Sequence, residues 1–385
     1  MSRHGSLASV RVALCQVNPT VGDVAGNLAL AARAVESARA SGTDLAVLPE
    51  LCLTGYPPMD LLDRRALVAA NMKARDALAR SAHGIAVVVG YVDRNPRETG
   101  KPLVNAAAVL VDGRVASVHA KSLLPTYDVF EESRRFEPAH EMVPANVCGL
   151  RVGVTVCEDA WCGDAATRSL YATDPVDDLA AAGIDLLVNV AASPFTTHKR
   201  ALRPQVLAAA ARRAGVPLVF VNQVGGNDDL VFDGASALFA ADGTVLARAH
   251  EFHEEVLVAD VHAGGPIADM AGDIDAVLDA LVLGTRDYAR KCGFKTAVIG
   301  LSGGIGSALV AWVAAEALSA ENVNCVALPS RSRRATRRTR RSWTHERSRV
   351  RSAATSMSSR STACSRELST TWARRLTSPT RLSPT

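Results

Sequence analysis

The sequence predicts an α/β protein in which two similar halves form a sandwich of two sheets with helices outside. Short apolar segments rich in β-branched residues, typical of buried strands, alternate with alanine-rich segments of helical spacing. Two hairpins also echo one another, because residues 103–120 and 235–249 each place an Asp-Gly turn between apolar strands. This repetition indicates the two halves.

The elements of each half follow from the spacing of apolar residues. The first half is expected to contain strands at 10–17, 45–48 and 85–91, helices at 27–40 and 67–81, and the hairpin 103–111 and 114–120. The second half is expected to contain strands at 150–156, 184–190 and 217–222, helices at 174–182 and 203–215, and the hairpin 235–240 and 244–249.

A second α/β domain begins after Gly264-Gly265-Pro266, which marks a boundary. Its expected elements are helix 274–291, strand 296–301, helix 308–318 and strand 324–328. The predicted organisation is therefore a first domain over residues 1–265, a linker with helix over 266–285, the start of a second domain over 286–330, and a tail over 331–385.

The formal net charge of +4 combines two unlike segments. Residues 331–385 hold 15 arginines and two acidic residues and carry about +13, whereas residues 1–330 carry about −9. No apolar run reaches about 18 residues and no apolar region of a secretion signal is present, so we expect no membrane partner. Eight scattered cysteines without CxxC spacing favour reduced thiols in the cytoplasm.

Cys157, Glu50 and Lys121 each come at the carboxyl end of a predicted strand. Chemistry in α/β proteins gathers at such ends, so folding can bring the three side chains together. Each also has an ordinary alternative: Cys157 as a buried small apolar residue, Glu50 as an acid at a helix start, and Lys121 as a solvated lysine.

Together these side chains suit cleavage of an unactivated amide C–N bond. A carboxylate can take the thiol proton, a cysteine can hold the acyl group, and a lysine ammonium can stabilise the negative oxygen of a tetrahedral intermediate. The sequence therefore predicts an amide-cleaving site with a cysteine nucleophile.

With these residues in place, the sequence resembles the nitrilase superfamily over about residues 10–262. The motifs VLPELCLTGY around Glu50, HAKSLLP around Lys121 and VTVCEDAW around Cys157 occur in the family's order. The resemblance implies a nitrilase-like α-β-β-α sandwich. It also implies that Glu132, in VFEESRRF, is the family's second glutamate near the site.

Within that superfamily the segments TGYPPMDLL, LPTYDVFEESRRFEP and NVAASPFTTHKR resemble the glutaminase domain of glutamine-dependent NAD synthetases. This resemblance implies that Tyr127, Ser193 and Lys199 hold a glutamine substrate. Taken alone, they read as a loop aromatic residue, a turn serine and a solvated lysine. Nitrilase-like domains self-associate, so a homo-oligomer is also expected.

The segment VIGLSGGIGSALVAWVAAEAL resembles the PP-loop of ATP pyrophosphatases, whose pattern is SGGxDS. A glycine-rich turn between strand and helix lets backbone N–H groups approach phosphates. The residues implied to bind ATP are Gly300, Leu301, Ser302, Gly303, Gly304, Ile305, Gly306 and Ser307. The implied reaction adenylates nicotinate adenine dinucleotide with ATP and Mg²⁺, and ammonia from glutamine then displaces AMP to give NAD; pyrophosphate is the other product.

The chain departs from this pattern in one residue that matters for metal binding. The family has Asp where this chain has Gly306, and the family uses that carboxylate to ligate Mg²⁺. Gly306 has no side chain to bind a metal, so no metal-ligating residue is assigned and metal-assisted adenylation is expected to be defective.

The second departure is the tail, where Arg, Ser and Thr make up 37 of the last 55 residues. Such a segment cannot bury enough apolar surface to fold, so we expect disorder. We hypothesise a frame-shifted translation, because out-of-frame reading of alanine-rich, GC-rich codons gives such a composition. The alternative is a basic tail that binds nucleic acid through its phosphates. Only two aromatic residues, Trp343 and Trp372, are present to stack on bases, so the composition does not favour this alternative.

Three functions remain open from the sequence. The first is a glutamine-dependent NAD synthetase polypeptide with an intact glutaminase half and a broken synthetase half, whose partners are glutamine, nicotinate adenine dinucleotide and ATP, without nucleic acid. The second is a freestanding amidase or carbamoylase of the same superfamily. The third is a catalytically idle product or assembly subunit.

Overall fold

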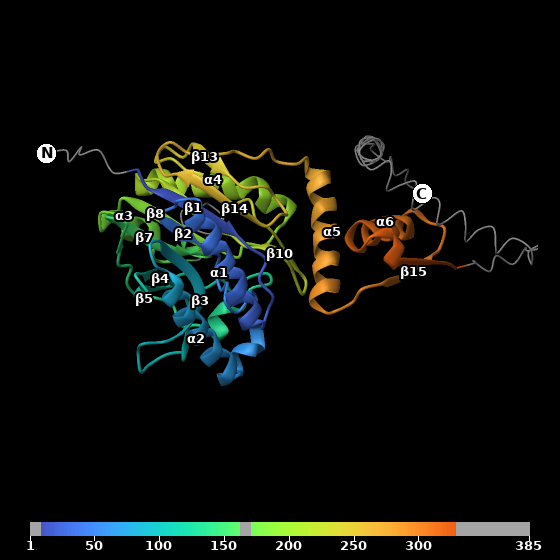
Figure 1. Cartoon of the computed structure of the whole chain (residues 1–385), viewed down its shortest axis with the longest axis horizontal. Coiled ribbons are helices and arrows are strands. Elements are labelled where there is room, and N and C mark those ends of the chain that lie inside the picture. Colours follow the sequence, from blue (N-terminus) through green and yellow to red (C-terminus); the bar gives the residue numbers. More distant parts are fainter. Residues whose placement is uncertain (1–8, 162–170, 329–385) are drawn as a thin grey trace, which may run out of the picture. The chain divides into compact units, whose positions relative to one another are not determined.

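The computed structural model describes residues 9–161 and 171–328, and the chain divides into two units, Met1–Met270 and Ala271–Thr385 (Figure 1). The division falls just after the Gly264-Gly265-Pro266 segment at which the sequence predicts a boundary. The Arg/Ser/Thr-rich tail predicted to be disordered lies outside the described residues.

In the first unit, one six-stranded sheet has the order β14-β1-β2-β3-β4-β5. Strands β1, β2 and β3 are parallel, β14 is antiparallel to β1, and the β4–β5 hairpin is antiparallel to β3. The bounds are β14 (Glu255–Asp260), β1 (Arg11–Gln16), β2 (Leu45–Val47), β3 (Ala86–Arg94), β4 (Leu103–Val111) and β5 (Arg114–Ala120).

The second six-stranded sheet, in the order β13-β12-β9-β8-β7-β6, repeats this arrangement. Strands β7, β8 and β9 are parallel, β6 is antiparallel to β7, and the β12–β13 hairpin is antiparallel to β9. The bounds are β13 (Val245–Arg248), β12 (Ala237–Phe239), β9 (Leu218–Asn222), β8 (Leu186–Ala191), β7 (Leu150–Val156) and β6 (Ala145–Val147). The two halves predicted from the hairpins are confirmed.

Helices cover the outer face of each sheet, which gives the predicted α-β-β-α sandwich (Figure 1). Helices α1 (Val24–Ala40) and α2 (Arg65–Ser81) pack on the first sheet, and α3 (Pro175–Ala181) and α4 (Thr197–Ala214) belong to the second.

Strand β1 shows how period-two alternation builds both layers of core. Val12 and Leu14 join a buried cluster with the second sheet, whereas Ala13 and Cys15 join the cluster beneath α1 and α2. Successive side chains of a strand point to opposite faces, so one apolar strand supplies both clusters.

Helix α4 begins at Thr197, so the prediction of a start at residue 203 is wrong. The Thr196 hydroxyl instead caps the helix by accepting from the amide of Lys199, and Pro204 lies inside. The earlier start matters for the site because it places Lys199 on the helix.

Four strands were missed by the sequence analysis: β6, β14, and the two-stranded sheet of β10 (Val224–Asn227) and β11 (Leu230–Asp233). β6 has three residues and β10 contains two glycines, so neither carries an apolar pattern of useful length. β14 pairs with β1 along all six of its residues, but as a half-buried edge strand its alternation is weak. Short 3₁₀ helices are η1 (Met59–Asp63), η2 (Glu132–Arg134), η3 (Cys157–Ala160) and η4 (Ala320–Asn322).

The described part of the second unit is the start of another α/β domain. It comprises α5 (Asp273–Lys291), β15 (Ala297–Leu301), α6 (Ile305–Leu318) and β16 (Val323–Ala327), with β15 and β16 parallel. α6 begins at Ile305 rather than at residue 308 as predicted, so Ile305 to Ser307 form its first turn. Across both units, none of the helices within the described ranges has the length and apolar character needed to cross a bilayer.

Candidate active site

The structure places the three predicted residues just beyond strand ends of the two sheets. Glu50 follows β2, Lys121 directly follows β5, and Cys157 directly follows β7 and opens η3. Glu50 and Lys121 are fully buried, and Cys157 is 7% exposed. Burial therefore excludes the ordinary alternative of a solvated lysine, and Glu50 lies in a turn rather than at the start of a helix.

Lys121 lies between two carboxylates. Its Nζ is 2.8 Å from Glu50 Oε1 and 2.9 Å from Glu132 Oε1. Burial alone lowers the pKa of Lys121, but the charges of Glu132 and Glu50 outweigh it and raise the pKa well above 10.5. Lys121 is consequently a fixed ammonium ion at the centre of the site.

The carboxylate of Glu50 is held on both oxygens. Oε1 accepts from Lys121 and, at 2.7 Å, from Asn105 Nδ2, and Oε2 accepts from the amide of Ala192 at 2.9 Å. The Glu50 backbone packs directly on Gly90 of β3, where an added Cβ would lie 2.5 Å from the Glu50 Cα. Glycine at position 90 therefore permits the close approach that aims this carboxylate.

Glu132 completes the carboxylate pair from η2. Its Oε1 accepts from the Tyr56 hydroxyl at 2.9 Å, and its Oε2 accepts from Asn105 Nδ2 at 3.3 Å. Burial raises the pKa of Glu132, whereas Lys121 opposes that rise. A single amide side chain, Asn105, thus bridges both glutamates that flank the lysine.

Cys157 occupies a tight backbone turn with φ of +45°, a conformation that L-residues adopt rarely. Burial raises the pKa of its thiol well above 9.0 and the charge of Glu50 raises it further, whereas Lys121 lowers it. The thiol is therefore protonated near neutral pH. A base must take its proton when it attacks.

Asp159 fixes the position of Cys157 relative to Lys121. Its Oδ1 accepts from the amides of Ser122 and Leu123 at 3.0 and 2.8 Å, and its Oδ2 accepts from the amide of Val156 at 3.0 Å. Burial raises the pKa of Asp159 to about 7, although these amide donors lower it. One side chain thus joins the segment after Lys121 to the turn that carries the thiol.

Two of the predicted glutamine-binding residues, Tyr127 and Lys199, interact with a further buried acid, Glu158. Glu158, next to the thiol, is 3% exposed and accepts from the hydroxyls of Tyr127 at 2.8 Å and Tyr171 at 3.0 Å. Burial raises the pKa of Tyr127, and the neighbouring charge of Glu158 adds to the effect, so Tyr127 remains a proton donor.

Lys199, in the first turn of α4, points its ammonium at two aromatic rings. Its Nζ lies 5.1 Å from the ring centroid of Phe130 and 5.2 Å from that of Trp161. Burial lowers the pKa of Lys199, while the charges of Cys157 and Glu158 raise it. Lys199 is therefore not a solvated surface lysine.

Ser193 follows β8, and its main-chain amide donates to Asn222 Oδ1 at 2.8 Å. The residue is 1% exposed, and its hydroxyl has no hydrogen-bond partner within residues 9–161 and 171–328. A buried hydroxyl without a partner is costly in a folded protein, so it is available to a ligand.

The structure thus brings Glu50, Lys121 and Glu132 into direct contact, and the charges of Glu50 and Lys121 act on the Cys157 thiol. The sequence analysis missed Tyr56, Asn105, Glu158 and Asp159 as site residues. Asn105 sits inside an apolar strand, and a polar residue there is the one signal that could have identified it. Glu158 and Asp159 directly follow the nucleophile in sequence. The spacing could not show that Glu158 contacts tyrosine hydroxyls whereas Asp159 contacts backbone amides.

The predicted ATP-binding residues form the glycine-rich turn between β15 and α6. Gly303 has φ of +83°, and the hydroxyls of Ser302 and Ser307 lie 3.2 Å apart. Position 306 presents open space instead of a carboxylate, and no group of three or more His, Cys, Asp or Glu in the described ranges could hold an ion. The side chains of this turn therefore do not supply a Mg²⁺ ligand.

Comparison with known families agrees with this architecture. The family model for carbon-nitrogen hydrolases matches residues 11–265, more than half of the chain. The chain therefore belongs to the carbon-nitrogen hydrolase family. A second family model, NAD synthase, matches residues 277–367, of which those beyond residue 328 lie outside the described structure.

Relatives that resemble both units are named glutamine-dependent NAD(+) synthetase. The chain is 43% identical to such a protein of Rhodobacter capsulatus over 332 residues and 40% identical to one of Synechocystis over 331 residues, each match covering 83% of this chain. The same matches cover 57% and 59% of the relatives. The chain therefore spans less than two thirds of their length.

Solved structures give the same picture. A glutamine-dependent NAD+ synthetase from Acinetobacter baumannii, in complex with ADP, matches with a TM-score of 0.76 and 34% identity over 83% of this chain and 60% of that one. An amidase of Nesterenkonia matches with a TM-score of 0.56 and 25% identity over 65% of this chain and 90% of that one. Another structure of that amidase has an acetamide group added covalently at its active-site cysteine.

Replacing Lys121 by methionine should strongly destabilise the first unit, because two buried carboxylates would lose their shared cation. We expect the free energy of unfolding in urea at neutral pH to fall by about 3–5 kcal/mol. The control Arg134→Met removes the cation of an exposed pair with Glu131 and should cost less than about 1 kcal/mol. Equal losses in the two variants would contradict the arrangement.

Alkylation of Cys157 by iodoacetamide should follow the raised pKa of its thiol. Thiolate is the reactive form, so the rate should climb about tenfold per pH unit through neutrality and still be rising at pH 9.0. Mass spectrometry of the Cys157 peptide measures this rate, with the Cys157→Ala protein identifying the labelled peptide. A plateau near neutral pH would show that the resting residue is a thiolate.

Proposed function

We propose that the first unit hydrolyses the side-chain carboxamide of glutamine to glutamate and ammonia. The observation that carries this proposal is the buried Lys121, which contacts Glu50 and Glu132 and whose charge acts on the Cys157 thiol. The membership of the carbon-nitrogen hydrolase family and the similarity to glutamine-dependent NAD(+) synthetases support it.

In the first half-reaction Cys157 Sγ attacks the carboxamide carbon while Glu50 takes the thiol proton. The carbonyl oxygen becomes negative and is stabilised by the Lys121 ammonium. Glu50 then returns the proton to the nitrogen as the C–N bond breaks, so that ammonia leaves and a thioester remains on Sγ. The hydrogen bonds on both oxygens of Glu50 keep it oriented for these two transfers.

The second half-reaction is hydrolysis of the thioester. Glu50 takes a proton from a water molecule that attacks the acyl carbon, the C–S bond breaks, and the proton returns to sulfur. Lys121 again faces the developing negative oxygen. Glu132 contacts Lys121 and Tyr56, so its role is to hold the ammonium in place rather than to transfer a proton.

Glutamine differs from simple amides by its α-carboxylate and α-ammonium groups, which need partners of opposite charge. Lys199 and the free hydroxyl of Ser193 suit the carboxylate. Glu158, held by Tyr127 and Tyr171, is a buried anion next to the nucleophile and suits the ammonium group. This assignment adds Glu158 to the residues that the sequence resemblance implies.

For the whole polypeptide we propose a glutamine-dependent NAD synthetase whose synthetase half is defective. Ammonia from glutamine would serve ATP-dependent amidation of nicotinate adenine dinucleotide, with ATP phosphates on the turn formed by residues 300–307. Gly306, which offers no carboxylate to a metal ion, counts against that second reaction. A homo-oligomer remains the expectation from the resemblance, and a cytoplasmic location remains the expectation from the scattered cysteines.

A freestanding amidase or carbamoylase is the second candidate. It is favoured by the Nesterenkonia amidase, since 90% of that chain is matched within this one. Lys199, Ser193 and Glu158 distinguish the two candidates, because a simple aliphatic amide has no charged groups for them to bind.

Purified protein should release ammonia from glutamine, and Cys157→Ala should lower the rate by at least about a thousandfold while the fold is retained. A coupled assay for ammonia measures both rates, and circular dichroism checks the fold. The control Cys148→Ala removes an exposed thiol and should leave the rate near that of the wild type.

Two other results would replace the glutaminase proposal. Faster hydrolysis of aliphatic amides or N-carbamoyl compounds than of glutamine would identify the freestanding enzyme. Equal, background-level ammonia release by the wild type and by Cys157→Ala would identify the idle product.

The same protein should form no NAD from ATP, Mg²⁺, nicotinate adenine dinucleotide and either glutamine or ammonium salt. The reason is that position 306 offers no metal ligand. Chromatography of the nucleotides measures the product. NAD formation at a rate above that of a boiled control would show that the synthetase half works.

A further inference from the structure

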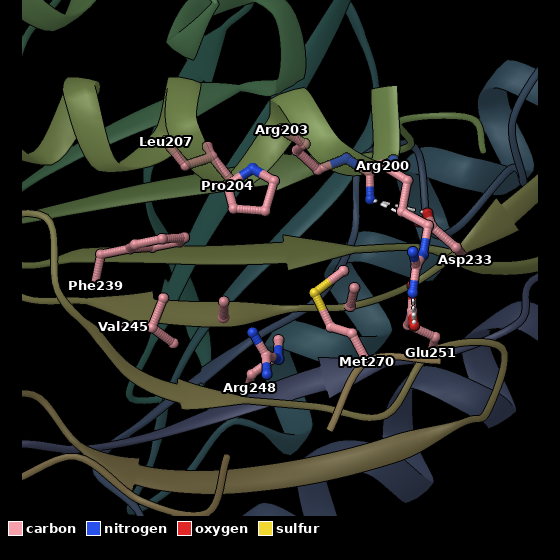
Figure 2. Close-up of a pocket in the computed structure, with 12 residues that line it drawn as sticks. Arg200, Arg203, Pro204, Leu207, Asp233, Phe239, Val245, Arg248, Glu251 and Met270 are labelled. Atoms are coloured by element: carbon pink, nitrogen blue, oxygen red, sulfur yellow. Dashed lines mark hydrogen bonds and ion pairs between the residues drawn. The ribbon is translucent and has the colours of Figure 1, made fainter. Parts of the chain in front are cut away.

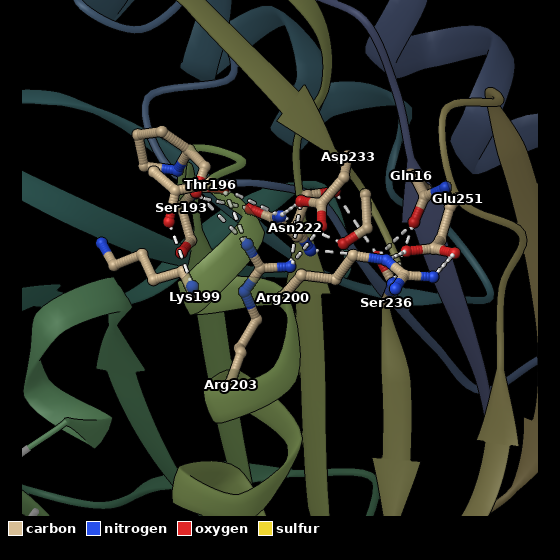
Figure 3. A network of polar contacts seen from close by, with 12 residues as sticks. Gln16, Ser193, Thr196, Lys199, Arg200, Arg203, Asn222, Asp233, Ser236 and Glu251 are labelled. Carbon is tan, nitrogen blue, oxygen red and sulfur yellow. Dashed lines mark hydrogen bonds and ion pairs between the residues drawn. The ribbon is translucent and has the colours of Figure 1, made fainter. Parts of the chain in front are cut away.

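Asn222, at the end of β9, holds the main chain of Ser193 at two points. Its Oδ1 accepts from the Ser193 amide at 2.8 Å, and its Nδ2 donates to the Ser193 carbonyl at 3.2 Å (Figure 3). Both peptide groups of a turn residue are thereby fixed by one side chain from the neighbouring strand. The position of the free Ser193 hydroxyl consequently depends on Asn222.

Arg203, on α4, also contacts the turn at Ser193. Its Nη2 lies 3.4 Å from the carbonyls of Ser193 and Pro194, and its Nη1 is 2.9 Å from both oxygens of Asp233 (Figure 3). Asp233 also accepts from Asn222 Nδ2 at 3.4 Å. One carboxylate therefore orients both side chains that hold the turn.

The three side chains of this group are almost completely buried. Asn222 and Asp233 are fully buried, and Arg203 is 3% exposed. Loss of one member therefore leaves buried partners around the Ser193 turn without their hydrogen bond.

We propose that Asp233, Asn222 and Arg203 are the positioning group for glutamine, acting through Ser193. This inference rests on the proposed glutaminase function. The three residues hold the Ser193 turn so that its hydroxyl meets the substrate, and they take no part in bond making or breaking. Their loss should therefore raise the KM for glutamine more than it lowers kcat.

The chain contains a matched control one turn away. Arg200 forms the same kind of buried ion pair with Glu251, at 2.6 and 2.8 Å, and both arginines line the cavity shown in Figure 2. Arg200→Lys and Arg203→Lys both keep the charge and lose the planar two-pronged donor. They differ in what the arginine holds: Arg200 pairs with Glu251, whereas Arg203 pairs with Asp233 and contacts the Ser193 turn.

The test is a double-mutant cycle on glutamine hydrolysis. Arg203→Lys and Ser193→Ala should each raise KM about tenfold, as expected for one lost hydrogen bond, with kcat changed much less. The double variant should show about the same KM as Ser193→Ala alone, because Arg203 acts through that residue. Arg200→Lys should leave KM near the wild-type value.

Asn222→Ala provides a second entry to the cycle, since it removes the two-point contact while leaving the Arg203–Asp233 pair. Asn222→Ala should raise KM as Arg203→Lys does. In the Ser193→Ala background it should cause no further rise in KM. The positioning role would be overturned if the increases in KM multiplied in the double variants. It would also be overturned if Arg200→Lys raised KM as much as Arg203→Lys does. Absence of glutamine hydrolysis by the wild type would instead remove the proposed function, and this inference with it.

Discussion

The contact of one buried ammonium with two buried carboxylates governs the arrangement of the first unit. Lys121, Glu50 and Glu132 come from segments far apart in the chain, and none could be buried without the others. Their mutual compensation fixes the loops after β2 and β5 and the η2 segment at one place. The thiol of Cys157 stays protonated until a base acts, mainly because burial raises its pKa and also because the charge of Glu50 adds to that rise. Folding and chemistry here depend on the same charges.

Much of this fold is predictable because the strands are apolar on both faces and the hairpins carry Asp-Gly turns. β4, β5 and β7 were predicted with the bounds that the structure gives. β10 and β11 were not, because each strand has only four residues and β10 contains two glycines, although the two strands pair as a local hairpin around Asp228-Asp229. The start of α4 was predicted at residue 203 rather than at Thr197, where the Thr196 hydroxyl caps the helix. Local signals predict elements, and long-range packing decides where they end.

Among the site residues, strand ends identified Glu50, Lys121 and Cys157, and family resemblance added Glu132. Spacing could not reveal that Asn105 bridges the two glutamates, because residues 50, 105 and 132 meet only in three dimensions. The same holds for the buried group behind Ser193, whose members come from β9, α4 and β11. Side chains that position other side chains leave almost no trace in a single sequence, since their partners are unknown until the chain is folded.

Asp159 has a consequence for how the site can move. Its carboxylate is shared by the amides of Ser122, Leu123 and Val156, so the loop beyond the lysine and the approach to the nucleophile cannot loosen independently. Separating the two segments would leave several of these backbone amides buried without a hydrogen-bond acceptor. Opening of this region is therefore cooperative, and the acid, the amine and the sulfur behave as parts of one rigid body rather than as three mobile loops.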